Sequence, residues 1–261
     1  MGKDGRFDSG RPFDWSRTSE TYAKYRDGYP AELYDALEKY GIGHAGQSVL
    51  DLGTGTGALA RGMYPRGARW TGADISASQI EQARILSARK DMDIEYIVAS
   101  AEDAPFPAGS FDAVTACQCF WYFDERRALE NIHRILRPDG LLCIIYMFWL
   151  PGQSEAAAGT ERIILKYNPV WTGGGYRKTP PSVPEGAAGL FECAALDTFE
   201  ADVEFTPESW HGRMKACRGT GASMDPDSLA LWEKEHLEYA AALPERFSVP
   251  HYITLTLLRA V

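Results

Sequence analysis

Residues 49–60 read VLDLGTGTGALA, the most informative stretch of this chain. An apolar run ends at Asp51, and Gly53, Gly55 and Gly57 then alternate with threonines before a second apolar run. The pattern predicts a buried strand that turns through a glycine loop into a helix. Because glycine has no Cβ, such a loop can turn tightly and approach a bound molecule closely. The N–H groups at the start of the helix suit a nucleotide or another anionic group.

Two classes of cofactor are bound by loops of this kind. Gly53, Gly55 and Ala58 satisfy G-x-G-x-x-G/A, the fingerprint of dinucleotide-binding proteins. The glycines alone therefore leave NAD and S-adenosylmethionine open, and a tight turn that binds no ligand is a third interpretation.

The composition is that of an ordinary soluble globular protein. Of the 261 residues 45% are apolar and 24% are charged, so the chain can bury a substantial core as one domain with an inserted lobe. Acidic residues exceed basic ones, 36 against 27, which gives a net charge of −9. Because no block of lysine and arginine occurs, we expect no nucleic-acid partner.

Signals for targeting and for metal binding are not seen in the sequence. The polar residues 1–20 do not resemble a signal peptide, and the apolar run Leu141–Leu150 is about half as long as a bilayer requires. We therefore expect no membrane association. The five cysteines form no CxxC pair, which predicts no metal site and no disulfide framework. Reduced, mostly buried thiols in a cytoplasmic protein are expected instead.

Strands and helices alternate through the first half of the chain. After the first strand, further strands are predicted at Trp70–Ala73, Ile94–Ala99, Phe111–Ala116 and Leu141–Trp149. Helices are predicted after Pro30, Ser76 and Asp124; Ser76 and Gln79 form a capping box, and Pro138–Gly140 ends the third helix. This alternation predicts an α/β fold with a doubly wound, mostly parallel, Rossmann-like sheet.

The regular alternation ends after Pro151. Beyond it we predict helices at Glu155–Tyr167 and Asp225–Leu243 and strands at Leu196–Phe205 and Tyr252–Leu258. The expected organisation has four parts, which are a flexible terminus (1–20), a cofactor-binding core (21–150), an inserted lobe that covers the substrate (151–245) and a final antiparallel strand that completes the core sheet (246–261).

Ligands of a parallel sheet bind beyond the carboxyl ends of its strands. Asp74 ends the second strand, 19 residues after Gly55, close to the spacing that places a carboxylate on ribose hydroxyls. The segment Ala101-Glu102 follows the third strand, where an adenine would lie. The pair Cys117-Gln118 ends the fourth strand and would face the reacting end of the cofactor.

Each of these polar residues also has a plainer interpretation. Asp74 and Ser76 could cap the following helix, and Glu102 could be a solvated turn residue. Gln118 could be a satisfied polar group at the end of a strand. The residues themselves leave both interpretations open.

The order of the motifs nevertheless resembles one family. YAKYRDGYP (22–30), DLGTGTG (51–57), GADISASQIEQA (72–83), SAEDAPFPAGSFDAV (100–114) and RILRPDGLL (134–142) are similar to the class I S-adenosylmethionine-dependent methyltransferases. Within that class the chain resembles the small-molecule group that includes trans-aconitate methyltransferases. The resemblance covers about residues 20–150.

The resemblance implies roles for several positions. In that family the first-strand acid and the glycine loop hold the methionine moiety, which matches Asp51, Gly53, Thr54, Gly55 and Gly57. The acid of the second strand holds the ribose and matches Asp74, and Ile75 would pack on the adenine. The acid after the third strand contacts the adenine and matches Glu102, together with Ala101.

The resemblance also implies that the N-terminal segment folds over the cofactor. Tyr22, Tyr25 and Arg26 match that segment, and Arg26 would pair with the methionine carboxylate. Asp27 stands where these proteins commonly have proline, which would loosen the cover. Trp121-Tyr122 replaces a His-Trp pair of some relatives, so we expect no catalytic histidine there.

The resemblance decides between the cofactors. Two features are not explained by a nicotinamide-dependent enzyme. They are the sequence pattern from the fourth to the fifth strand and the final apolar strand after a long insertion. We therefore expect S-adenosyl-L-methionine as the cofactor and S-adenosyl-L-homocysteine as the product.

Methyl transfer asks little of the protein, because the sulfonium already activates the methyl group. The enzyme has to align nucleophile, methyl and sulfur and to exclude water, and a carboxylate acceptor would need no general base. Candidates for the wall of a substrate pocket are the large rings Trp121, Tyr122, Trp149, Trp171, Tyr176 and Trp210. His211 and Arg213 could act on a proton or bind an anionic group. Core or surface placement explains each of these side chains as well.

The function predicted from the sequence is methyl transfer from S-adenosylmethionine to oxygen, nitrogen or carbon of a small metabolite. Two alternatives are a protein that binds the cofactor without turnover and a methyltransferase that acts on RNA or protein. Residues 168–171 read NPVW, similar to a tetrapeptide of enzymes that methylate adenine or glutamine amides. That tetrapeptide follows the fourth strand in those enzymes, whereas here it follows the fifth.

Overall fold

The computed structural model describes residues 7–26 and 28–261, which form two compact units. The first, which we name the sheet unit, contains residues 28–147, 179–199 and 253–261. The second, the helical unit, contains the described residues before 27 together with 148–178 and 200–252. The boundaries between the units fall within or next to the fifth, sixth and seventh strands.

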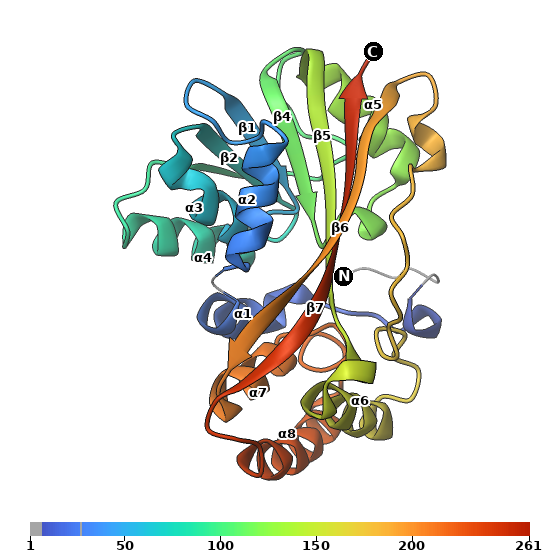
Figure 1. The fold of residues 1–261 in the computed structure, drawn as a ribbon. Helices are drawn as coiled ribbons and strands as arrows, with labels where there is room; N and C mark the ends of the chain where they lie inside the picture. Colours follow the sequence, from blue (N-terminus) through green and yellow to red (C-terminus); the bar gives the residue numbers. More distant parts are fainter. Residues whose placement is uncertain (1–6, 27) are drawn as a thin grey trace. The chain divides into compact units, whose positions relative to one another are not determined.

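The sheet has seven strands in the order β3-β2-β1-β4-β5-β7-β6 (Figure 1). Their bounds are Ser48–Leu52 (β1), Arg69–Asp74 (β2), Glu95–Val98 (β3), Phe111–Cys117 (β4), Leu136–Trp149 (β5), Phe191–Phe205 (β6) and Phe247–Ala260 (β7). Strands β1 to β5 pair in parallel, and β7 runs against them. The strand order reverses beside β1, between β1 and β4. The predicted mostly parallel, Rossmann-like sheet with an antiparallel final strand is thus confirmed.

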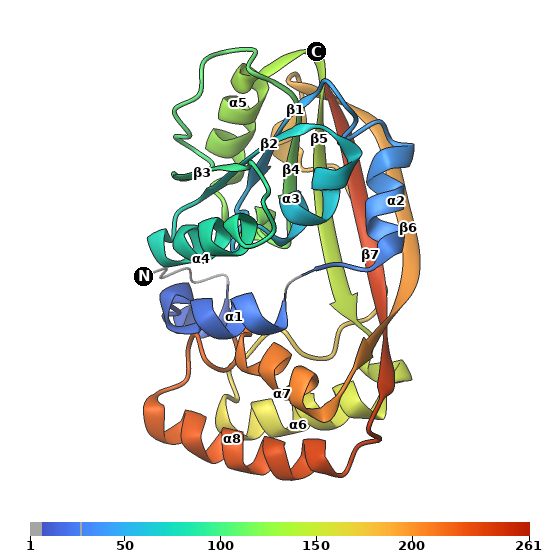
Figure 2. The same cartoon turned by 90° about the vertical axis from the view of Figure 1, so that its left-hand side faces the viewer.

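Helices cover both faces of the sheet unit. Their bounds are Ala31–Lys39 (α2), Ala58–Met63 (α3), Ala77–Ala88 (α4) and Glu125–Ile135 (α5), with short 3-10 turns at Tyr64–Arg66 (η3), Phe120–Tyr122 (η4) and Glu185–Ala187 (η6). Helices α2 and α5 lie on opposite faces (Figure 2). Leu129 and Ile132 of α5 are buried against Leu50 and Val114 of the central strands. This apolar layer holds the carboxyl ends of β1, β2 and β4 at one edge.

Helix α5 ends earlier than the sequence predicted. It stops at Ile135, and β5 begins directly at Leu136, so Pro138–Gly140 lies inside the strand and does not end the helix. The residue before a proline avoids the helical region, which explains why the chain is already extended at Arg137. Asp139 has φ 62°, and the pairing with β4 is irregular there.

The predicted capping box at Ser76 is not formed. Ser76 occupies the N-cap of α4, but its hydroxyl group bonds to Ser78 at 3.0 Å and makes no cap. Gln79, at the third position of the helix, is buried. The carboxylate of Asp74 accepts the Ser76 N–H instead, at 2.8 Å.

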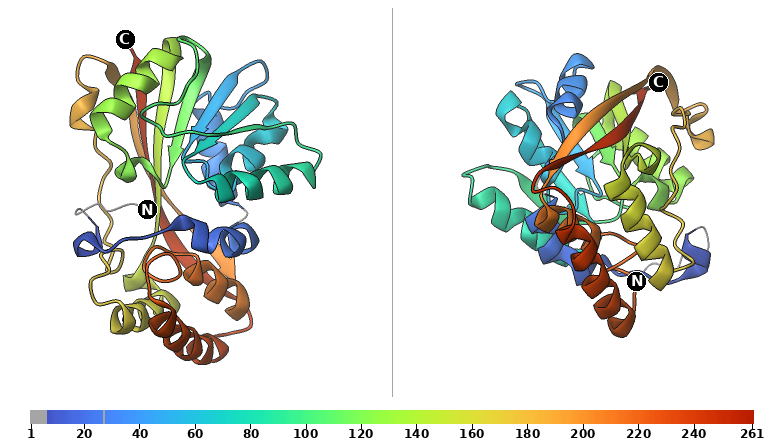
Figure 3. Two further views of the ribbon diagram at one scale, coloured as in Figure 1. Left: turned by 180° about the vertical axis from the view of Figure 1, so that it is seen from behind. Right: turned by 60° about the horizontal axis from the view of Figure 1, so that its bottom comes forward.

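The core of the helical unit contains several tryptophans. Its elements are Asp8–Gly10 (η1), Trp15–Thr18 (η2), Ser19–Tyr25 (α1), Pro151–Gln153 (η5), Glu155–Tyr167 (α6), Pro207–Lys215 (α7) and Pro226–Ala241 (α8). Helix α6 packs on α8, and α7 packs on both α1 and α8 (Figure 3). Trp210 and Trp232 are fully buried in this core. Helices α6 and α8 match the predicted ranges, whereas α1 and α7 were not predicted.

The N-terminal segment is held within the helical unit. Asp8 is buried; it accepts the N–H of Thr172 at 2.7 Å and pairs with Arg218 at 3.2 Å. The Asp14 N–H donates to the carbonyl of Ala222 at 2.9 Å. Residues 7–20, which we expected to be flexible, are therefore described as η1, η2 and the start of α1, whereas 1–6 lie outside the described residues.

Two further features concern the described chain as a whole. Among residues 7–26 and 28–261, every helix is too short or too polar to span a lipid bilayer. All five cysteines are free thiols, and only Cys193 is exposed.

Candidate functional site

Strand β1 places Asp51 beneath the glycine loop. Its carboxylate is 1% exposed and accepts the hydroxyl groups of Thr54 at 2.6 Å and Thr115 at 2.7 Å. Burial raises the pKa of Asp51 to about 6, and the nearby charge of Asp74 adds to the effect. The two hydroxyl groups oppose that rise because they stabilise the ionised form. Through these two hydrogen bonds Asp51, on β1, links the glycine loop to strand β4.

The glycine loop requires glycine at its turning points. Gly53, Gly55 and Gly57 all have positive φ, at 64°, 56° and 79°. A Cβ on Gly53 would lie 2.7 Å from Cys119, and one on Gly57 would lie 2.9 Å from Cζ of Tyr96. The loop is therefore specified both by backbone conformation and by the side chains packed against it.

Asp74 joins the second strand to this loop. One oxygen of its carboxylate accepts the Gly55 N–H at 2.9 Å, and the other accepts the Ser76 N–H. Burial raises the pKa of Asp74, and the two N–H groups oppose that rise. The structure thus brings together the two parts of the site that the sequence predicted separately.

Two large apolar side chains are exposed next to Asp74. Ile75 is 75% exposed, and Val98, which pairs with Asp74 across β2 and β3, is 52% exposed. Both follow or end parallel strands, so they lie at the edge where Asp74 lies. This edge presents an apolar surface beside a carboxylate, which suits an adenine attached to a ribose.

Helix α5 holds the segment that follows β3. The carbonyl of Ala101 accepts a hydrogen bond from Asn131 at 2.9 Å. One carboxylate oxygen of Glu102 accepts the N–H of Asp124, the N-cap of α5, at 2.8 Å. A carboxylate has further lone pairs, so Glu102 keeps acceptor capacity for a ligand.

The end of β4 carries a residue in a strained conformation. Cys117 is buried, and Gln118 has φ 64°, in the left-handed region that disfavours a side chain. The Gln118 N–H donates to Ile145 at 2.9 Å, and its amide donates to the carbonyl of Met147. These bonds to β5 hold the strained residue, a pattern that recurs at ligand sites.

The predicted N-terminal cover belongs to the helical unit. Tyr22 lies on α1, and the guanidinium of Arg26 lies 4.3 Å from the centre of its ring. The hydroxyl group of Tyr25 bonds to Glu208 of α7 at 2.9 Å. Asp27 lies outside the described residues.

The six aromatic side chains that were predicted to line a substrate pocket lie in separate groups. Trp121 stacks on Tyr146 at 4.4 Å, next to Tyr122, in the sheet unit. In the helical unit Tyr176 stacks on Phe148 at 3.8 Å, and Trp149, Trp171 and Trp210 form one cluster. Trp171 and Trp210 are buried core, whereas the other four predicted rings keep partial exposure.

His211 and Arg213 also lie in the helical unit. His211 Nδ1 is 2.9 Å from Nδ1 of His236, and burial lowers the pKa of both, that of His236 to about 3. The guanidinium of Arg213 lies 5.7 Å from the centre of the Trp149 ring. His211 is therefore half-buried and hydrogen-bonded to the buried His236, and Arg213 borders the tryptophan cluster.

The sequence prediction missed Glu161. It lies on α6 and accepts the indole N–H of Trp149 at 2.7 Å and the N–H of Gly175 at 2.7 Å. Burial raises its pKa, and the two hydrogen bonds oppose that rise. The signal was present, because Glu161 shares the helical face of Ala157 and Ile164, which are buried.

Comparison with known proteins places this arrangement in a family. A model described as a methyltransferase domain matches residues 50–144. The demethylmenaquinone methyltransferase of Thermus thermophilus is 34% identical over 177 residues, which are 62% of this chain and 77% of that protein. The chain belongs to the class I S-adenosylmethionine-dependent methyltransferases.

Another curated protein and a solved structure are also similar to this chain. The O-methyltransferase resE of Aspergillus sclerotiorum is 43% identical over 104 residues, which are 38% of this chain and 39% of that protein. The chain thus spans about two fifths of the length of that relative. The structure of the YcgJ protein from Bacillus subtilis shares the fold, with a TM-score of 0.55 and 21% identity over 88% of this chain and 99% of that one.

The tetrapeptide at 168–171 has a structural role in this methyltransferase. Asn168 is fully buried; its side-chain oxygen accepts from Arg11 at 2.7 Å, and its NH₂ group donates to Gly219 at 3.0 Å. These bonds join three separate segments of the helical unit. The amide is engaged with the protein, as expected for a structural residue.

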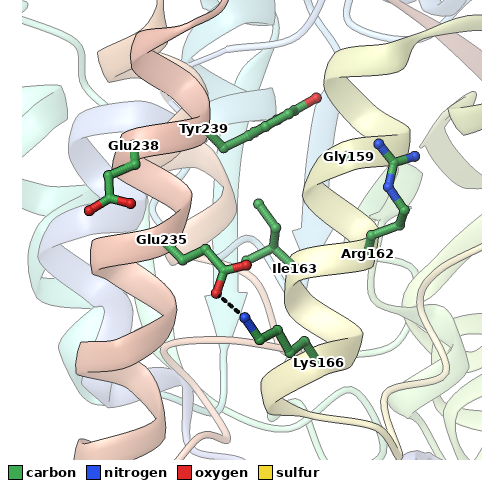
Figure 4. Close-up of a pocket in the computed structure, with 7 residues that line it drawn as sticks. All are labelled: Gly159, Arg162, Ile163, Lys166, Glu235, Glu238 and Tyr239. Atoms are coloured by element: carbon green, nitrogen blue, oxygen red, sulfur yellow. Dashed lines mark hydrogen bonds and ion pairs between the residues drawn. The ribbon is translucent and has the colours of Figure 1, made fainter.

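A surface groove lies between α6 and α8 (Figure 4). It is lined by Gly159, Arg162, Ile163, Lys166, Glu235, Glu238 and Tyr239. Lys166 pairs with Glu235 at 2.6 Å, and Arg162 pairs with Glu155. These pairs are typical of a solvated helix surface. Among the described residues, no group of three or more potential metal ligands comes together.

Proposed function

We propose that this methyltransferase transfers the methyl group of S-adenosyl-L-methionine to a small-molecule acceptor, with S-adenosyl-L-homocysteine as product. The observation that carries the proposal is the bond between Asp74 and the Gly55 N–H, at the strand edge where Ile75 and Val98 are exposed. Carboxylate, glycine loop and apolar edge match the parts of a sulfonium nucleoside: ribose, amino-acid tail and adenine.

Each part of the site has a proposed role in binding the cofactor. Gly53, Thr54, Gly55 and Gly57 approach the methionine moiety through the main chain, over Asp51. The carboxylate of Asp74 accepts from the ribose hydroxyls. Ile75 packs on the adenine, and Ala101 and Glu102 contact its edge. Bound there, S-adenosylmethionine supplies a methyl group already activated by its sulfonium.

The remaining cofactor contacts concern the reacting end and the amino-acid tail. Cys117 and Gln118 face the reacting end, where the hydrogen bonds of Gln118 to β5 fix its position. Arg26, beside Tyr22, pairs with the methionine carboxylate. The protein's contribution is then alignment and exclusion of water, which suffices for an activated methyl group.

The acceptor is proposed from chemistry and from relatives. Relatives include an O-methyltransferase and a ubiquinone/menaquinone biosynthesis C-methyltransferase of Hahella chejuensis, which supports attack by oxygen or carbon of a small molecule. Trp121, Tyr122, Trp149 and Tyr176 keep partial exposure and are the proposed contacts for it. The trans-aconitate group, a carboxylate acceptor and a cytoplasmic location stay predictions from the sequence.

The proposal is tested by product formation. The protein is incubated with S-adenosylmethionine that carries an isotope-labelled methyl group and with a metabolite extract, and mass spectrometry follows both products. We expect S-adenosylhomocysteine together with a small molecule that carries the label. Cofactor binding without any S-adenosylhomocysteine would favour a non-catalytic binding protein, and label found only in RNA or protein would favour a macromolecular substrate.

A further inference from the structure

Residues 99–110, which we name the β3–β4 segment, link those two strands without forming a helix or a strand. The N–H of Ala99 donates to the carbonyl of Asp74 at 3.0 Å, so the segment begins beside the proposed ribose site. Further along, Ala101 and Ala104 are buried, with exposed fractions of 5% and 1%. Because their carbonyl groups lie outside the sheet and away from water, these groups need other partners in the protein.

Two side chains of α5 supply these partners. Asn131 donates from Nδ2 to the carbonyl of Ala101 at 2.9 Å. Arg134 donates to the carbonyls of Phe106 at 2.7 Å and Ala104 at 3.3 Å. Because helical positions three apart share one face, both side chains meet the segment from the same side. Through them α5 fixes the path of a segment that has no regular structure of its own.

The amide of Asn131 is held in one orientation. Its Oδ1 accepts two bonds from Arg134, at 2.6 Å and 3.2 Å, and an arginine side chain can only donate. The Ala101 carbonyl can only accept, so it requires the NH₂ group. A rotation of the amide by half a turn would therefore set like groups against each other at both ends. Asn131 is 8% exposed, so the surrounding protein shields these bonds from water.

The residue that Asn131 fixes directly precedes Glu102. One oxygen of Glu102 accepts the N–H of Asp124 at 2.8 Å, at the start of α5. The Glu102 carboxylate is thus held twice by the same helix, through its side chain at Asp124 and through its main-chain neighbour at Asn131. Its remaining lone pairs can accept from a ligand. Adenine carries a suitable donor, which is its exocyclic amino group.

We propose that Asn131 is a positioning residue for recognition of the adenine ring. Its amide, oriented by Arg134, fixes the Ala101 carbonyl and thereby the point at which Glu102 accepts the adenine amino group. The inference rests on the proposed function, because the adenine is that of the cofactor. Asn131 acts through its neighbours and does not itself touch the ligand. Helix α5 then determines the base specificity of the cofactor site.

The test compares two ligands that differ only in the donor. S-adenosylhomocysteine and its 6-deamino analogue, in which a hydrogen atom replaces the adenine amino group, are titrated into the full chain by calorimetry. We expect S-adenosylhomocysteine to bind at least about tenfold more tightly, since a hydrogen bond to a charged acceptor is worth that much. Both ligands are measured on one protein sample, so a general loss of folded protein does not change the affinity ratio. A wild-type ratio near one would overturn the inference.

Asn131→Asp removes one donor and preserves the shape of the side chain. The carboxylate keeps the bonds from Arg134, but its second oxygen has no proton to offer the Ala101 carbonyl, so the segment has to shift. We expect the affinity ratio to fall at least about threefold, because members of one hydrogen-bond network are energetically coupled. Glu130→Gln, at an exposed position that pairs with Arg126, should keep the wild-type ratio. A merely structural role for Asn131 would leave the ratio unchanged in Asn131→Asp, and that result would remove Asn131 from the recognition of adenine.

A double-mutant cycle tests the role of Arg134. Asn131→Ala, Arg134→Ala and the double variant are titrated with the same two ligands. Because Arg134 acts through Asn131, the loss of the affinity ratio in the double variant should be smaller than the product of the two single losses. Losses that multiply would contradict the orientation of the Asn131 amide by Arg134.

The proposed function is measured separately from the affinity ratio. If the wild type binds S-adenosylhomocysteine and forms a methylated product while the ratio is the same in all variants, the inference fails and the proposed function holds. If the wild type does not bind S-adenosylhomocysteine, both fail.

Discussion

The carboxylate of Asp74 accepts the main-chain N–H of Gly55 at 2.9 Å, and this bond couples the end of β2 to the glycine loop. The two residues are 19 positions apart in sequence and belong to neighbouring parallel strands and their loops. Asp74 therefore has two tasks. It sets the conformation of the loop, and in the proposed function it offers its remaining lone pairs to the ribose.

Asp74→Ala should weaken cofactor binding at least about tenfold, since it removes both a charged acceptor and the bond to Gly55. Calorimetric titration with S-adenosylhomocysteine measures the dissociation constant. Asp93→Ala, at an exposed position, is the matched control and should bind as the wild type does. An unchanged constant in Asp74→Ala would contradict the proposed ribose contact.

Gly57→Ala should be much more destabilising than Gly109→Ala. Both glycines have positive φ, at 79° and 65°, so both substitutions carry the left-handed penalty of about 1–2 kcal/mol. A Cβ on Gly57 also meets Tyr96, whereas one on Gly109 meets nothing within 4 Å. Urea unfolding of both variants isolates the steric effect. Equal losses of stability would show that the contact with Tyr96 is easily relieved.

Asp51→Asn should be more stable than the wild type above neutral pH. Because folding raises the pKa of Asp51 from 3.8 to about 6, its contribution to stability is complete below pH 3.8 and is lost as the pH rises through about 6. The neutral variant does not titrate. The difference in unfolding free energy should therefore grow by about 3 kcal/mol between about pH 4 and about pH 8.

Denaturant unfolding of both proteins across this range checks that expectation. Thr54 and Thr115 can donate to the asparagine oxygen, and a hydroxyl group can also accept from its NH₂ group, so the variant keeps its partners. A difference that does not change with pH would show that the ionised form is not destabilised by burial.

Because of His236, the free energy of unfolding should decrease at acidic pH. Thr160 donates its hydroxyl proton to Ala156 and accepts from Trp210, so His236 Nε2 has to donate to Thr160. In neutral His236 Nδ1 is then an acceptor, and His211 is the donor at 2.9 Å. A second proton on His236 would place two N–H groups against each other. Its pKa is accordingly lowered, to about 3, chiefly by burial.

The lowered pKa of His236 determines the direction in which stability changes with pH. The contribution of His236 is present above pH 6.5 and is lost as the pH falls from there towards about 3. His236→Gln should reduce the slope of unfolding free energy against pH by up to about 1.4 kcal/mol per pH unit in this window. His44→Gln, at an exposed histidine, serves as the control. A wild-type slope in His236→Gln would refute the buried neutral pair.

Local patterns predicted the sheet and the glycine loop well. The run ending at Asp51, the glycines after it and the acid at Asp74 are each read from a few neighbouring residues, and β1, β2 and their loop follow. The helix at Glu155–Tyr167 was predicted to its bounds because its apolar spacing is regular. Such features can be predicted from neighbouring residues, without information on contacts between distant parts of the chain.

Features that depend on distant contacts were not predictable. Asp8 is fixed by Thr172 and Arg218, which are more than 160 residues away, and nothing near Asp8 in the sequence indicates this. The grouping of the rings likewise depends on packing, as Trp149 meets Trp210 only in the folded chain. Glu161 was overlooked because a carboxylate on an apolar face looks like an irregularity until its hydrogen bonds are known.

The helical unit is assembled from three separate stretches of chain, two of which extend strands that begin or end in the sheet unit. The helical unit therefore cannot be replaced by that of a related protein through exchange of one contiguous segment. A chimaera that imports the helical unit of a relative would have to splice inside β5, β6 and β7 and replace the amino-terminal stretch as well. Recombination at one or two crossover points would instead separate Asp8 from the loop residues that bind it.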